Sequence, residues 1–222
     1  MKKRVFIIIC LALAVLVSGV PAFAGQEEEA LRSAFRAAAF RAEYDSEGTD
    51  VLRRWESPLD ISVSGDATPE DIAGLAEFIG QLNERVSGLP AVSLTENPDE
   101  ANIKIIFAPL DRFAEIEENY VPVNWGFFYF WYNSAYVIDA AHILIAADVT
   151  SQAERDHLIR EELVGAIGLP NDLEGEPDSI LYQKWTTTRE LSAMDWALLN
   201  LAYDGRLSPG MGWAEAARAL GW

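Results

Sequence analysis

The 222-residue chain is poor in cysteine, histidine and positive charge. Its single cysteine, Cys10, lies in the N-terminal apolar run, so the rest of the chain forms no disulfide and depends on its core for stability. The chain has 17 Lys and Arg residues against 35 Asp and Glu residues, a net charge of −18. We therefore expect no binding to nucleic acid or to anionic membrane surfaces, whereas cations, basic peptides and neutral glycans remain as ligand classes.

The N-terminus has the features of a secretory signal peptide. Three basic residues precede an apolar run, and Ala22-Phe23-Ala24 has the small-x-small pattern of a cleavage site. We predict that residues 1–24 are removed, that the protein is periplasmic or secreted, and that no membrane span remains after cleavage. A retained N-terminal anchor is the alternative, although the apolar run is short for a spanning helix.

The rest of the sequence predicts an N-terminal helix and linker over residues 25–50 and one domain over residues 51–222. Apolar residues at helical spacing indicate helices over residues 26–44, 68–88, 111–118, 151–168 and 191–201. Short runs rich in β-branched residues indicate strands over residues 59–64, 92–94, 103–107 and 141–147.

An aromatic segment precedes the last of these strands. Seven of the eight residues from Trp125 to Tyr132 are aromatic. One interpretation is an exposed platform for sugar rings or peptide side chains, as in a carbohydrate-binding module. We favour the other, a strand buried on both faces beneath the N-terminal helix, because large exposed apolar patches are rare.

The predicted helix over residues 151–168 is where we expect the chemistry. His157, Glu161 and Gly165 follow one another at four-residue spacing, opposite an apolar face, so this polar face is expected to look into a site. The helix should end at Gly168, with a sharp turn at the following proline. His157 and Glu161 could contact a metal together, but two ligands do not complete a site.

This segment resembles the metzincin zinc peptidases, whose H-E-x-x-H-x-x-G-x-x-H motif places two histidines on a helix and a third beyond a glycine turn. With Gly168 on the motif glycine, the general-base glutamate falls on Glu162. The three zinc-ligand positions fall on Glu161, Gly165 and Asn171, so none of them is a histidine.

Two C-terminal segments extend the resemblance. Asp178, Ser179, Leu181 and Tyr182 belong to D-S-I-L-Y, which looks like the S-x-M-Y turn beneath the zinc, with Leu181 in place of methionine. The segment from Leu191 to Asp195 is similar to the closing L-S-x-x-D helix of the same peptidases. Together with the R-E-E-L helix and the G-L-P-N-D turn, these segments also resemble a family of uncharacterised bacterial exported proteins.

The resemblance implies an α+β, zincin-like fold. Its parts would be a mixed twisted sheet with an antiparallel edge strand, two long helices on one face, and a C-terminal helix. Zinc is not expected as a cofactor, because catalytic zinc needs three firm donors and Gly165 offers none. Glu161 and Asn171 are two oxygen ligands at best, a set that suits calcium better than zinc.

Calcium has one further candidate location. Carboxylates alternate around Gly175 at Asp172, Glu174, Glu176 and Asp178, and alternating carboxylates in a glycine-containing loop can bind calcium. The spacing fits no standard loop, so we favour a solvated acidic turn and predict no bound metal.

The function that follows is that of an exported, non-catalytic metzincin-like protein that binds a peptide, protein or glycan of the cell envelope in the former substrate cleft. The alternative is a hydrolase with a rebuilt acidic or hard-cation site centred on Glu162, with Glu161, Asn171 or Asp172 beside it. Convergence of these four side chains on one pocket would favour the enzyme. Pairing of Glu161 and Glu162 with neighbouring residues, or their exposure to solvent, would favour the binding protein.

Overall fold

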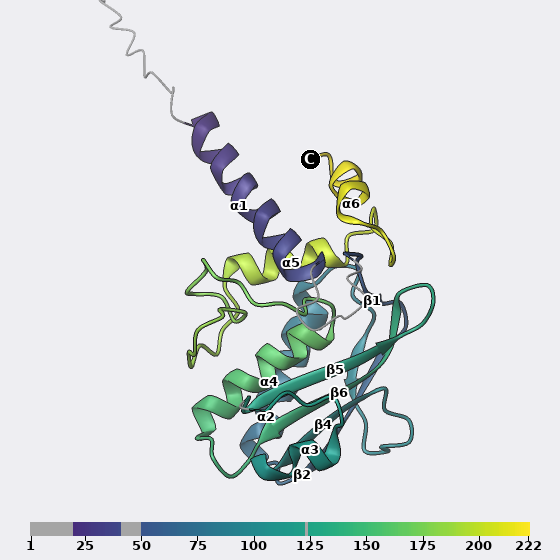
Figure 1. Cartoon of the computed structure of the whole chain (residues 1–222), viewed down its shortest axis with the longest axis vertical. Coiled ribbons are helices and arrows are strands. Elements are labelled where there is room, and N and C mark those ends of the chain that lie inside the picture. The colour runs from purple at the N-terminus through teal and green to yellow at the C-terminus, as the bar shows by residue number, and fades with distance from the viewer. Residues whose placement is uncertain (1–19, 41–49, 123) are drawn as a thin grey trace, which may run out of the picture.

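The computed structural model describes residues 20–40, 50–122 and 124–222 (Figure 1). Most of the predicted signal peptide, residues 1–19, therefore lies outside the described residues, as does most of the predicted linker. Residues 20–24 begin helix α1, Val20–Phe40. Within the described ranges, no helix is long and apolar enough to cross a membrane. Removal of the first 24 residues stays a prediction.

The fold is a mixed α/β arrangement around a mostly parallel sheet. Parallel strands run in the order β1-β6-β4-β2-β3, and β5 pairs antiparallel with β6. The strand bounds are β1 Arg54–Trp55, β2 Leu59–Gly65, β3 Val92–Leu94, β4 Ile103–Ala108, β5 Gly126–Tyr132 and β6 Val137–Ala146.

Two helices, α2 and α4, pack against each other, and α4 also packs on β5 and β6 (Figure 1). The long helix α1 extends away from the sheet, and its C-terminal end contacts α5. The bounds of the remaining helices are α2 Pro69–Arg85, the 3-10 turn η1 Leu110–Arg112, α3 Phe113–Ile116, α4 Gln152–Ala166, α5 Ala193–Ala202 and α6 Trp213–Leu220.

Local capping explains where α4 begins and how it is held. The Ser151 hydroxyl accepts a hydrogen bond from the Glu154 amide, and the Glu154 carboxylate accepts one from the Ser151 amide in return. The buried carboxylate of Asp71, in the first turn of α2, accepts hydrogen bonds from Gln152 Nε2 at 2.7 Å and Arg155 Nε at 3.2 Å. These bonds fix the start of α4 against α2 and so position the helix that carries the predicted site.

The aromatic segment forms β5, but it is not buried on both faces beneath the N-terminal helix, so that prediction is wrong. The strand packs on α4, and Phe127 alone among its rings is buried. Trp131 remains 37% exposed, because β5 pairs only with β6 and lies at the edge of the described sheet. Its rings do not form a flat platform either, since Tyr129 and Trp131 meet at an interplanar angle of 72°.

Three further differences concern boundaries and short elements. β6 begins at Val137, earlier than the predicted residue 141, and places His142 beside Glu117, with Nδ1 3.0 Å from Oε2. The two-residue strand β1 was not predicted, and α6 has no counterpart among the helices predicted by residue range, although a C-terminal helix was expected. β1 is too short to leave a pattern in the sequence, and it forms only because Arg54 and Trp55 pair with Val137 and Ile138.

Candidate functional site

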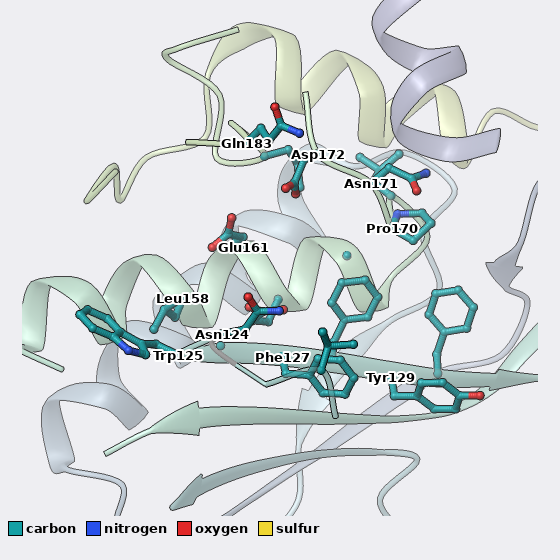
Figure 2. A pocket seen from close by; sticks show the side chains of 18 of the residues that line it. Asn124, Trp125, Phe127, Tyr129, Leu158, Glu161, Pro170, Asn171, Asp172 and Gln183 are labelled. Carbon is teal, nitrogen blue, oxygen red and sulfur yellow. The ribbon is translucent and has the colours of Figure 1, made fainter. Parts of the chain in front are cut away.

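A cleft of about 920 Å³ lies between β5, α4 and the loops that follow α4 (Figure 2). The four side chains named for a rebuilt hydrolytic site, Glu161, Glu162, Asn171 and Asp172, all line it. Aromatic side chains form much of the opposite wall. The other lining residues include Arg53, Trp125, Gly126, Phe128, Phe130, Tyr132, His157, Leu158, Gly165, Leu181, Tyr182, Lys184 and Trp185.

The polar face of α4 looks into this cleft, as its spacing predicts. Glu161 Oε2 lies 3.2 Å from His157 Nε2, one helical turn away. The other ring nitrogen, Nδ1, lies 2.6 Å from the Thr188 carbonyl oxygen. Burial lowers the pKa of His157, but the hydrogen bond and charge of Glu161, together with the Thr188 carbonyl, raise it above its ordinary value. Glu161 is thus paired within the protein.

The second motif-histidine position is occupied by an aromatic ring. A Cβ atom built on Gly165 would lie 2.4 Å from Cε1 of Phe128, well inside van der Waals contact. Glycine at position 165 therefore allows β5 to pack its Phe128 ring directly on the backbone of α4. No side chain can project from position 165 unless this ring moves.

The third ligand position serves the structure in another way. The Asn171 side chain is buried, and its Nδ2 donates a hydrogen bond to the Ala38 carbonyl oxygen at 3.0 Å, near the end of α1. Glu161, Gly165 and Asn171 consequently do not fit a zinc ion. Across the described residues, no three His, Cys, Asp or Glu side chains are grouped so that they could hold a metal.

Glu162, the position of the motif glutamate, lies at the floor of the cleft. Its side chain is 8% exposed, and no described residue donates a hydrogen bond to it. β5 approaches it closely at Gly126, where an added Cβ would lie 2.3 Å from Oε1. Burial, followed by the charges of Glu161 and Asp172, raises the pKa of Glu162 well above its ordinary value.

This shift predicts a pH-dependent stability. Because the folded state keeps a proton on Glu162 that the unfolded chain loses near pH 4.5, stability should fall as the pH rises from there through the raised pKa. Glu162→Gln should match the wild type in acid and exceed it at higher pH by about 1–3 kcal/mol in the free energy of unfolding. Urea unfolding between pH 4 and pH 9 measures this, with the exposed Glu174→Gln as the control. A difference independent of pH would contradict the assignment.

The predicted turn residues separate into two groups. Leu181 and Tyr182 line the cleft, whereas Gly168, Asp178 and Ser179 do not. Gly168 follows the end of α4 at Ala166 and its C-cap Ile167, and it has φ of +120°, in agreement with the predicted glycine turn. A Cβ at Gly168 would also approach the Arg53 carbonyl oxygen at 2.9 Å.

Ser179 belongs to a buried hydrogen-bond cluster behind the cleft. Its hydroxyl lies 2.5 Å from Oδ1 of Asp195, a fully buried carboxylate in the first turn of α5. Oδ2 accepts hydrogen bonds from the Ile180 amide at 3.0 Å and from the Ser192 amide at 2.7 Å. The resemblance at D-S-I-L-Y and L-S-x-x-D thus marks two segments that meet, and their contact fixes the loop that carries Leu181.

Sequence reasoning missed one corner of the cleft. The rings of Trp125 and Trp185 meet edge to face with centroids 5.2 Å apart, and Trp185 also contacts the His157 ring at 5.8 Å. Trp185 is 53% exposed. Its position could not be inferred, because it lies in an irregular loop with no pattern and meets Trp125 only through the tertiary fold.

Two solved structures of myroilysin are similar to the chain. One is 12% identical, with a TM-score of 0.44, and the match covers 71% of this chain and 99% of the myroilysin chain. The other is 11% identical, with a TM-score of 0.47, and the match covers 78% of this chain and 96% of the myroilysin chain. A search of curated proteins found no match. A family described as "Protein of unknown function (DUF2927)" matches residues 28–221, and the chain belongs to this family.

Proposed function

We propose that this protein is an exported, zincin-like binding protein that holds an extended peptide segment of a cell-envelope partner in the cleft, as an added strand along β5, without zinc chemistry. This mode of binding depends on backbone hydrogen bonds and on alternating side-chain pockets. It requires an open sheet edge that borders a cleft.

The open edge of β5 is the observation that carries the proposal. The Ala146 amide donates to the Trp125 carbonyl oxygen at 2.8 Å, and these residues are in register, since Gly126 pairs with Ile145. Backbone groups alternate in direction along an antiparallel pair. The N–H and C=O groups of Gly126, Phe128 and Phe130 therefore point away from β6, and all three residues line the cleft.

The side chains of β5 suit such a ligand as well. Phe128, Phe130 and Tyr132 share the face toward α4, where neighbouring rings contact each other at centroid distances of 6.1 and 6.3 Å. An extended peptide presents every second side chain to the same face. Alternate residues of the ligand would thus meet this aromatic wall, while the others face away from it.

A second candidate is favoured by one observation. Glu161, Glu162, Asn171 and Asp172 all line the same cleft, which is the convergence that a rebuilt hydrolytic site needs. Glu162, with its raised pKa, would act as the proton donor. Against it, Glu161 pairs with His157 and Asn171 with Ala38. Slow cleavage of a bound peptide, detected by mass spectrometry and lost in Glu162→Gln, would establish the hydrolase instead.

Strand addition predicts a two-residue period in the ligand. We expect the purified protein to bind members of a random decapeptide array, and methylation of successive backbone nitrogens of a bound peptide to weaken binding at every second position. Each lost hydrogen bond should cost about 1 kcal/mol, roughly a fivefold change in Kd. Fluorescence anisotropy measures it. Absence of binding, or losses without alternation, would refute the proposal.

The protein side of the same contact can be tested at Phe130. Proline there removes an outward N–H that takes no part in the β5–β6 pairing, and proline is tolerated on edge strands. Phe130→Pro should therefore weaken peptide binding more than Phe130→Ala, which loses the same ring. Equal thermal unfolding of the two variants would show that the difference arises from the open edge.

A further inference from the structure

Three carboxylates gather at one end of the cleft. Glu161 and Glu162 come from α4, and Asp172 comes from the turn that follows it. Figure 2 shows the side chains of Glu161 and Asp172 both directed into the space between α4 and the loop above it. The charges of both residues reach Glu162, since each raises its pKa. This end of the cleft is therefore rich in carboxyl groups.

Glu162 supplies an independent indication of a ligand. Its side chain is more than nine-tenths buried, lines the cleft, and receives no hydrogen bond from any described residue. A buried carboxyl group without a donor is costly, and its cost falls when a ligand brings N–H groups and positive charge. The missing partner is therefore one that carries donors as well as charge.

A metal ion does not meet this need. Among the residues that the structure describes, these carboxylates are not grouped closely enough to coordinate a single ion. A guanidinium or ammonium group is different, because it has several N–H donors and interacts with carboxylates spread around it. An organic cation thus fits these carboxyl groups better than calcium or zinc.

Aromatic rings adjoin the carboxylates. His157 connects the two, because its Nε2 lies 3.2 Å from Glu161 and its ring meets Trp185 with centroids 5.8 Å apart. Trp125 packs on Trp185 in turn. Tryptophan faces attract cations, so they would hold the alkyl stem and the charged end of a basic side chain. Two cationic side chains, Arg53 and Lys184, also line the cleft, and Arg53 lies over the Tyr132 ring at 4.7 Å.

Building on the peptide-binding function proposed above, we propose that the cleft selects a basic residue of the bound segment, and that the arginine or lysine side chain is held by Glu161, Glu162 and Asp172 beside Trp125 and Trp185. The acidic surface of the protein, with a net charge of −18, would draw such a segment toward the cleft.

The test compares peptides that differ in one charge. An arginine-containing decapeptide that binds in the array is resynthesised with citrulline, the neutral analogue of arginine. We expect the citrulline peptide to bind about tenfold more weakly or worse. Glu162→Gln should reduce this discrimination, and Glu161→Gln should do so as a second variant. The matched control Glu174→Gln, an exposed carboxylate outside the cleft, should keep it in full.

The outcomes separate this proposal from the previous one. Equal binding of the arginine and citrulline peptides, with alternation in the methylation scan retained, would overturn basic selection while leaving strand addition intact. If no decapeptide binds, agmatine serves as the probe. A rise in melting temperature with agmatine that Glu162→Gln abolishes would support the cation site without peptide binding. No shift with agmatine, together with no peptide binding, would overturn both proposals.

Discussion

Replacing Asp195 with alanine is expected to lower the free energy of unfolding by about 3–5 kcal/mol. The buried carboxylate accepts hydrogen bonds from the Ser179 hydroxyl, the Ile180 amide, and the amide and hydroxyl of Ser192. Alanine leaves these donors buried without a partner, and each unsatisfied donor costs about 1–3 kcal/mol. Urea unfolding at pH 7 measures the loss.

A matched control for Asp195 exists in the same chain. Glu154 occupies the same third position of a capping box at the start of α4, and its carboxylate bonds only to Ser151 at the surface. Glu154→Ala should therefore destabilise the protein much less than Asp195→Ala. Similar losses for both variants would show that Asp195 acts only as a helix cap and does not join the two C-terminal segments.

Introducing a side chain at Gly165 should also destabilise the protein. Gly165→Ala places a methyl group against the Phe128 ring, and overpacking of this kind costs about 1–3 kcal/mol, occasionally more. In a Phe128→Ala background the same change should become neutral or stabilising, since alanine is favoured over glycine inside a helix by about 1 kcal/mol. A double-mutant cycle of unfolding free energies measures the coupling between the two residues.

Gly80 provides the control for this cycle. It lies on α2 with no atom within 4 Å of an added Cβ, so Gly80→Ala should stabilise the protein in both backgrounds. If Gly165→Ala behaves like Gly80→Ala in the wild type, the Phe128 ring does not fill the second ligand position.

Local signals made much of the fold predictable. The capping boxes at Thr68, Ser151 and Ser192 mark helix starts that the structure places at these residues. The turn at Gly168 could likewise be predicted, because glycine accepts the positive φ found there and the following proline prevents the helix from continuing. The expectation of a family without an assigned reaction is confirmed by the family match.

The candidate site was less predictable, because its arrangement depends on contacts between distant segments. The sequence shows that position 165 carries no ligand, but not that Phe128 fills the space left there. It places Glu162 on α4, but the burial of its carboxyl group depends on Gly126 of β5. Likewise, nothing near Asn171 indicates that its amide bonds to Ala38. Such pairings arise only when the sheet, α1 and α4 are packed together.

The open edge of β5 carries a hazard of its own. An aromatic strand with outward N–H and C=O groups is a template on which a second copy of the same strand could assemble, the first step toward aggregation. The excess of carboxylates opposes this, because two molecules of net charge −18 repel each other before their edges meet. Salt weakens that repulsion by shortening its range to about 3 Å at 1 M. The negative charge of the chain thus opposes aggregation through the same strand edge that the proposed peptide ligand would occupy.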